Sequence, residues 1–152
     1  MTLFVVIDVE NVISIHDAVI GNRELQGLVG DKSLEATLGR VRNRLQYGFI
    51  SDVYDLAACY ATFLAKAHCF NDANKRTAAA VSFFILSVNK VEIDFPEVAL
   101  GDWIIDLASD KKSEIEFAHW LRSQLSWFWV LQPVFAIVLI EVGNRGKAKN
   151  HD

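Results

Sequence analysis

Ten consecutive residues, 68–77, place an imidazole, a carboxylate, two side-chain amides and two cations in one short stretch of the chain. The small and apolar residues that follow predict a helix over 73–89, so these groups fall at a helix N-terminus. Such a terminus offers unpaired backbone N–H groups and the positive end of the helix dipole to an anion. Asn74, Lys75 and Arg76 add side-chain donors there, and the stretch therefore predicts a phosphate-binding site.

The individual side chains of this stretch indicate a division of labour. His68 shortly precedes the cations, and histidine exchanges protons near neutral pH, so it is the candidate base for an attacking hydroxyl. Asp72 is the candidate ligand of Mg²⁺, which proteins commonly hold with one or two carboxylates and the phosphates themselves. Arg76 can grip a phosphate with two N–H groups, and Lys75 supplies a more mobile point charge. Phe70 alternates with these polar residues, and we expect it to point into the core and anchor the loop.

Residues 68–76, HCFNDANKR, resemble the signature of the Fic/Doc family, His-x-Phe-x-Asp-(Gly or Ala)-Asn-(Gly or Lys)-Arg. The form with alanine and lysine is similar to that of the Doc branch, whereas most Fic proteins carry Gly-Asn-Gly-Arg and transfer AMP from ATP to a hydroxyl. The resemblance assigns nucleotide binding to Ala73, Asn74, Lys75 and Arg76, the metal to Asp72, and catalysis to His68, Asp72, Lys75 and Arg76. It thereby implies ATP and Mg²⁺ as cofactors.

The same resemblance implies a toxin of a toxin–antitoxin system. Doc proteins are protein kinases that transfer the γ-phosphate of ATP to a threonine of elongation factor Tu and so block translation, and their lysine is associated with an inverted nucleotide pose. A Phd-type antitoxin is the implied partner, since the inhibitory spacing Ser/Thr-x-x-x-Glu of many Fic proteins does not occur in this sequence. Two alternatives stay open: AMP transfer to a protein hydroxyl, and a catalytically silent module that binds the antitoxin.

The resemblance covers residues 11–125, which predicts a Fic/Doc domain over 1–125 and a C-terminal tail of unknown role over 126–152. Within the domain, Tyr47, Gly48, Phe49 and Ile50 resemble the flap, a small β-hairpin that holds the target polypeptide as an added strand. Without the resemblance, a plain connection between two helices is the favoured interpretation of residues 46–51.

The periodicity of apolar residues predicts an all-α fold, and the resemblance implies a helical bundle of the Fic/Doc type around a buried central helix, with a small hairpin flap. Helices are expected over residues 11–21, 33–46, 52–67, 73–89, 97–108 and 113–125. Start signals support several of them: Ser33, Ser51 or Asp52, Pro96 at a first helical position, and Ser113. The helix over 73–89 is apolar nearly all round, so we expect it to be the buried central helix that fixes the phosphate site in a cleft.

Charge and cysteine content narrow the class of protein. A net charge of −4 argues against direct nucleic-acid binding, which usually requires a basic surface. Two cysteines, Cys59 and Cys69, are too few for a disulfide framework, so we expect buried thiols and a cytoplasmic protein.

Two further features have more than one interpretation. The apolar stretch 125–140 is shorter than the about 20 residues of a membrane span and is interrupted by Gln132 and Pro133, so a membrane anchor is disfavoured. The alternatives for this tail are a strand or a further packed element over residues 134–142, or a contact with an oligomer partner or antitoxin. His16 beside Asp17 resembles a His-Asp element in the first helix of Doc proteins; a structural hydrogen-bonding role is favoured over a second catalytic pair.

Overall fold

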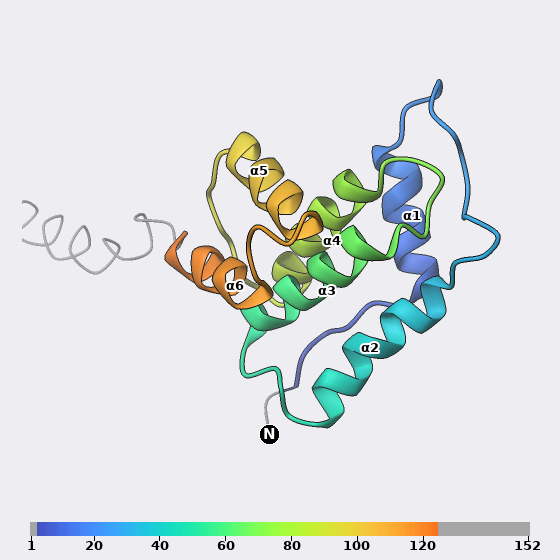
Figure 1. Ribbon diagram of the computed structural model, residues 1–152. Coiled ribbons are helices and arrows are strands. Elements are labelled where there is room, and N and C mark those ends of the chain that lie inside the picture. The colour runs from blue at the N-terminus through green and yellow to red at the C-terminus, as the bar shows by residue number, and fades with distance from the viewer. Residues whose placement is uncertain (1–2, 125–152) are drawn as a thin grey trace, which may run out of the picture.

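The computed structural model describes residues 3–124, and within them it contains six helices and no strand. The helices are α1 (Val9–Val19), α2 (Leu34–Gln46), α3 (Val53–Ala67), α4 (Asn74–Val88), α5 (Glu97–Ala108) and α6 (Glu114–Ser123) (Figure 1). The predicted all-α class is confirmed. The predictions for the C-terminal tail concern residues outside the described part of the chain. No helix in the described part is long and apolar enough to cross a membrane.

Side-chain caps set where most of these helices begin. Asp8 caps α1 and forms a reciprocal capping box with Asn11, which is why α1 starts two residues before the predicted position. Ser33, Asp52 and Ser113 cap α2, α3 and α6, each accepting a hydrogen bond from the backbone N–H three residues later. These caps satisfy N–H groups that the first turn of a helix leaves without partners.

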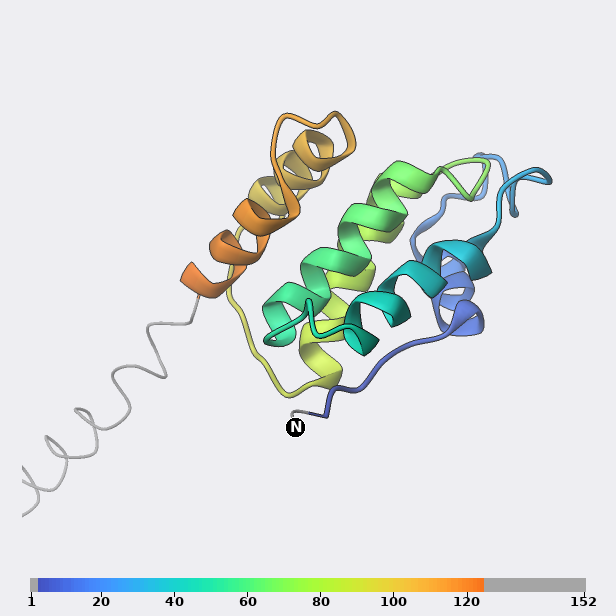
Figure 2. The ribbon, with the colours of Figure 1, turned by 60° about the horizontal axis from the view of Figure 1, so that its bottom comes forward.

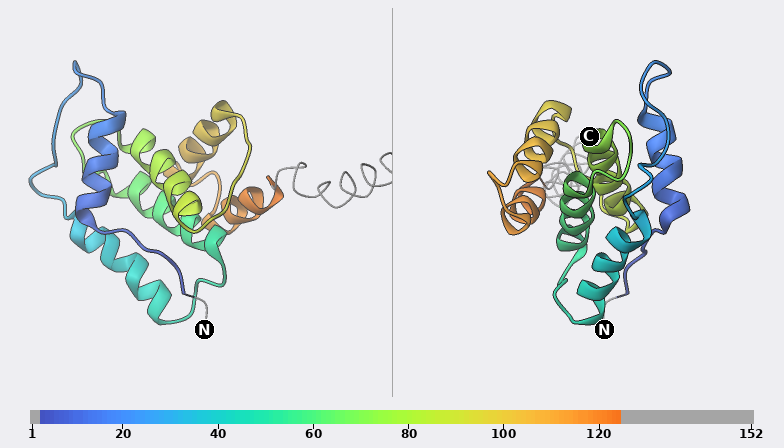
Figure 3. Two further views of the ribbon diagram at one scale, coloured as in Figure 1. Left: turned by 180° about the vertical axis from the view of Figure 1, so that it is seen from behind. Right: turned by 45° about the vertical axis from the view of Figure 1, so that its right-hand side comes forward.

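The helices form three layers, with α3 and α4 between the pair α1 and α2 and the pair α5 and α6 (Figures 2 and 3). Nine of the fifteen residues of α3 are buried, and α3 packs on α2, α4, α5 and α6. The predicted central helix α4 does lie in the middle layer, but it is less enclosed than α3. Its Phe83 is 51% exposed and Phe84 is 39% exposed, so one apolar face of α4 looks outward.

The connection between α2 and α3 corrects the predicted flap. Residues 47–50 form no hairpin: Gly48 adopts a left-handed conformation (φ 73°), and Phe49 N–H donates to Arg44 O at 2.9 Å, which closes the end of α2. Tyr47 and Phe49 are exposed, and Ile50 is buried. Because the fifteen residues of α3 follow this connection and rise about 1.5 Å each, it lies about 22 Å from the motif at the other end of α3. The glycine and aromatic residues that suggested a hairpin serve here as a helix stop.

Candidate functional site

The motif loop, residues 68–73, joins α3 to α4 and is bounded by two residues in a left-handed conformation. His68 (φ 50°) ends α3, and Ala73 (φ 59°) precedes the first residue of α4. Such a conformation is uncommon for residues other than glycine and costs on the order of 1 kcal/mol or more each, so contacts around the loop must hold it. His68 is exposed at the loop's start.

Asn74 supplies two of these contacts from within the motif. Its side-chain oxygen accepts a hydrogen bond from Phe70 N–H at 3.0 Å, and its side-chain NH₂ donates to Phe70 O at 2.8 Å. The amide therefore closes the loop by mimicking a pair of backbone groups. Phe70 itself is 3% exposed, which is the inward orientation expected for the anchor of the loop.

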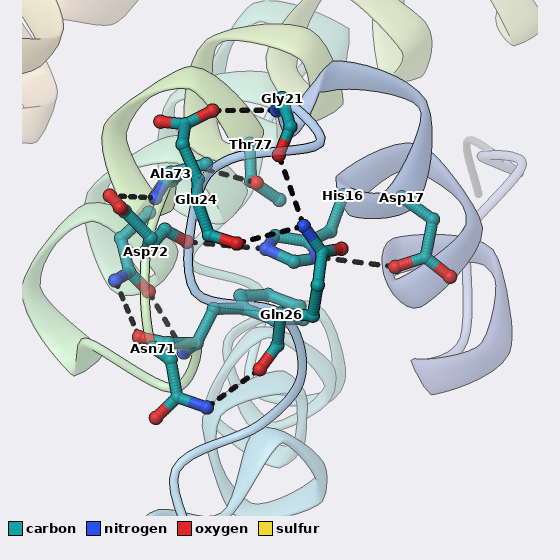
Figure 4. A network of polar contacts seen from close by, with 11 residues as sticks. His16, Asp17, Gly21, Glu24, Gln26, Asn71, Asp72, Ala73 and Thr77 are labelled. Carbon is teal, nitrogen blue, oxygen red and sulfur yellow. Dashed lines mark hydrogen bonds and ion pairs between the residues drawn. The ribbon is translucent and has the colours of Figure 1, made fainter.

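His16 ties helix α1 to the same loop (Figure 4). Its ring is fully buried and stacks on Phe70, with ring centroids 3.9 Å apart and planes within 6°. Nε2 lies 3.2 Å from Asp72 O, a carbonyl that can only accept, so Nε2 is the donor; Nδ1 lies 3.2 Å from a carboxylate oxygen of Asp17. A fully buried ring engaged in this way is a structural element, in agreement with the favoured interpretation of this pair.

The first turn of α4 leaves its backbone donors pointing out of the helix. The first intrahelical bond is donated by Thr77 N–H to Ala73 O at 2.9 Å, and no side chain caps the helix. One Asp72 oxygen accepts from Ala73 N–H at 2.8 Å, one residue before the helix. The N–H groups of residues 74–76 therefore have no intrahelical acceptor, which is the arrangement that binds anions at helix N-termini.

The two cations of the motif differ in their contacts. Lys75 is exposed and forms no ion pair among residues 3–124. Arg76 pairs with the carboxylate of Glu24 and donates from Nη1 to Val19 O at 3.2 Å. The hydrogen bond between the two side chains lowers the pKa of Glu24 and raises the pKa of Arg76.

The connection between α1 and α2, residues 20–33, lies against the motif loop and was not predicted from the sequence. Asn71 N–H donates to Gly27 O at 3.0 Å, Asn71 Nδ2 donates to Gln26 O at 2.8 Å, and Val29 N–H donates to Cys69 O at 2.8 Å. Leu28 and Phe70 form an isolated antiparallel bridge. Three closely spaced glycines, at 21, 27 and 30, were the sequence signal that could have pointed to this loop. Gly27 has a positive φ of 86°. This connection is called the α1–α2 loop below.

Asp72 is the predicted ligand of Mg²⁺. It is half-buried, and Ala73 N–H engages one carboxylate oxygen, which leaves the other oxygen available. The described residues contain no group of three or more His, Cys, Asp or Glu side chains that could hold a metal ion by themselves. A single carboxylate fits Mg²⁺, which usually keeps several waters and shares its coordination with substrate phosphates.

Comparison with known proteins gives two matches that agree with each other. The model of the Fic/DOC family matches residues 6–86, which includes α1, the α1–α2 loop and the whole motif. The chain is also similar to a protein of Escherichia phage P1 named protein kinase doc, with 37% identity over 115 residues. That alignment covers 74% of this chain and 90% of the phage protein, so the likeness extends over nearly the full length of that relative.

Proposed function

We propose that this chain, which belongs to the Fic/DOC family, is the toxin of a toxin–antitoxin pair and acts as an ATP-dependent protein kinase. Its relative from phage P1 is named a protein kinase, which supports phosphoryl transfer over other chemistry. The observation that carries the proposal is the uncapped start of α4, with both cations in its first turn and with the candidate base and the carboxylate in the loop that precedes it. The proposed acceptor is a threonine of elongation factor Tu in the cytoplasm.

Nucleotide binding is assigned to the beginning of α4. The backbone N–H groups of residues 74–76 would bind phosphate oxygens, and the left-handed Ala73 turns the chain so that these groups face outward. Lys75 and Arg76 would neutralise charge on the polyphosphate. Asn74 contributes through its backbone, because its side chain is used on Phe70.

The transfer itself needs one proton acceptor and good positioning. His68 takes the proton of the threonine hydroxyl as its oxygen attacks the γ-phosphorus, the bond to the β–γ bridging oxygen breaks, and ADP leaves. Asp72 would hold Mg²⁺, which when bound supplies charge neutralisation at the phosphates. His16 and Phe70 do not react; they hold the backbone that presents His68 and Asp72.

The target polypeptide is proposed to lie along the α1–α2 loop. This is the connection that lies against the motif through backbone hydrogen bonds and a strand-like bridge. Leu25 and Leu28 on it are exposed and offer apolar contacts to a bound chain. An extended peptide would gain backbone hydrogen bonds at such an edge.

A Phd-type antitoxin is the proposed partner, and a groove beside α4 is its proposed site. The groove has a volume of about 650 Å³ and is lined mainly by apolar residues of α4, α5 and the segment between them, with Phe83, Phe95 and Leu100 among them. Arg76 also lines this groove. An amphipathic segment that fills the groove would therefore cover one of the phosphate-binding cations, which links antitoxin binding to inhibition.

Labelled ATP tests the proposal directly. Purified protein is incubated with elongation factor Tu and ATP labelled at either the α- or the γ-phosphate, and label on the factor is measured. We expect only γ-label to move; α-label would instead identify an AMP transferase, and movement of neither label would identify a silent binding module.

Two variants assign the base in the same assay. His68→Ala should abolish transfer while nucleotide binding survives, because the proposed phosphate ligands remain. His119→Ala, which removes an exposed histidine of α6, is the matched control and should transfer label normally. Full activity in His68→Ala would exclude the assigned base.

A further inference from the structure

The ion pair between Glu24 and Arg76 links the α1–α2 loop to the phosphate-binding residues. Arg76 is 51% exposed and Glu24 is 28% exposed. Both Nη atoms of Arg76 are engaged: Nη2 donates to Glu24, and Nη1 donates to Val19 O. These are two of the donors with which a guanidinium grips a phosphate bidentately.

Glu24 is held in this position by its own turn (Figure 4). Its second carboxylate oxygen accepts from Gly21 N–H at 2.6 Å, and Glu24 N–H donates to Gly21 O at 3.1 Å. The Gln26 side chain donates to Gly21 O and to Glu24 O, each at 3.0 Å. A mobile surface carboxylate would lose conformational entropy when it pairs, whereas this one is already oriented toward Arg76 by its own turn.

We infer that Glu24 competes with the phosphates of the nucleotide for Arg76 and so weakens nucleotide binding. This inference rests on the proposed function and names a regulation of the same site. Lys75 and Arg76 carry two positive charges, and Asp72 carries one negative charge. The negative charge of Glu24 brings the net charge of these four side chains to zero. An incoming polyphosphate therefore meets a neutral site in which Arg76 is already paired.

The competition predicts an effect on binding and not on the chemical step. Among the described residues, no hydrogen bond or ion pair joins Glu24 to His68 or Asp72, and its pairing partner Arg76 is proposed to bind phosphates. The α1–α2 loop carries the competing carboxylate and is the proposed docking edge for the target. A segment that moves Glu24 aside would therefore also tighten nucleotide binding.

Glu24→Gln isolates the charge. The glutamine oxygen can still accept from Gly21 N–H, so the turn is kept while the negative charge is lost. Binding of the ATP analogue AMP-PNP with Mg²⁺ is measured by calorimetry at low salt, and an exposed charge pair of ordinary strength predicts about two- to fivefold tighter binding than in the unaltered chain. The difference should shrink as salt is added, because screening weakens the competing pair.

Glu35→Gln is the matched control, because Glu35 pairs with Arg42 on the exposed face of α2 and should not alter AMP-PNP binding. Gly21→Ala is the second variant: its Cβ would lie 2.8 Å from the Glu24 carboxylate and displace it without removing its charge. It should tighten binding by less than Glu24→Gln does. Thermal unfolding of each variant confirms folding.

The outcomes separate this inference from the proposed function. Tighter, salt-sensitive binding in Glu24→Gln supports the competition. Equal or weaker binding in that variant overturns it and makes Glu24 a positioning residue, while nucleotide binding by the unaltered chain still supports the proposed function. If the unaltered chain and Glu24→Gln both fail to bind AMP-PNP, the proposed function and the inference fall together.

Discussion

Replacing Asn74 with alanine should destabilise the motif loop more than it disturbs the proposed phosphate-binding groups. The substitution removes both hydrogen bonds between the Asn74 side chain and the Phe70 backbone, at 3.0 and 2.8 Å. The Phe70 N–H and C=O then lose their partner inside a loop that already contains two left-handed residues. The Phe70 ring remains stacked on His16, so we expect the loop to be destabilised but to keep its overall conformation.

The magnitude follows from these two bonds. A neutral hydrogen bond contributes about 0.5–1.5 kcal/mol net to stability, and alanine regains about 0.5 kcal/mol of helix propensity relative to asparagine. We therefore expect Asn74→Ala to lower the free energy of unfolding by about 1–2 kcal/mol. Urea unfolding followed by circular dichroism measures this difference, provided that the slope against urea is unchanged.

Lys75→Ala is the control in the adjacent position. Lys75 is exposed, so its removal should change the free energy of unfolding by less than about 0.5 kcal/mol while it weakens AMP-PNP binding. The two variants thus separate a residue that builds the loop from one that faces the ligand. An Asn74→Ala protein as stable as the unaltered chain, with nucleotide binding alone lost, would refute the structural role assigned to the amide.

Three further predictions concern the scaffold. Arg122→Ala should lower the free energy of unfolding by roughly 1 kcal/mol at neutral pH, as measured by urea unfolding. Burial raises the pKa of Asp52, but hydrogen bonds from Arg122 and the backbone outweigh it and lower this pKa from 3.8. The loss of stability should therefore fade as the pH falls below about 4 and Asp52 is protonated. Gly27→Ala should destabilise by about 1 kcal/mol because of its positive φ, whereas Gly30→Ala, with open space around its Cβ, should not. Burial raises the pKa of Cys59 to about 12, so alkylation mapped by mass spectrometry should modify it only after unfolding.

The helix boundaries were predictable because their signals are local. Ser33, Asp52 and Ser113 each cap a helix within a residue of the predicted start, and each does so through a backbone N–H three positions away. Such an interaction can be recognised in a short window of sequence. Pro96 is also at a helix start, although it precedes the first helical residue and does not occupy it.

The environment of the motif was not predictable in the same way. The α1–α2 loop meets residues 69–71 through backbone groups, which every residue carries, so no side-chain type announces the pairing. Residues 47–50 attracted the flap assignment because a glycine among aromatic residues suits a hairpin as well as a helix stop. Only the path of α3, which separates them from the motif, decides between the two.

The motif residues divide into those that build the loop and those that face outward, and side-chain type alone does not reveal the division. Asn74 and Arg76 both donate hydrogen bonds and were both assigned to phosphate. In the structure, the Asn74 amide bonds to the backbone of Phe70, four residues earlier, and Arg76 pairs with the carboxylate of Glu24, fifty-two residues earlier. The first contact is fixed by the fold of the loop, since it satisfies both the N–H and the C=O of Phe70. The second joins two partly exposed side chains, which a phosphate could separate, and on that difference rests our inference that the proposed site is regulated through Arg76.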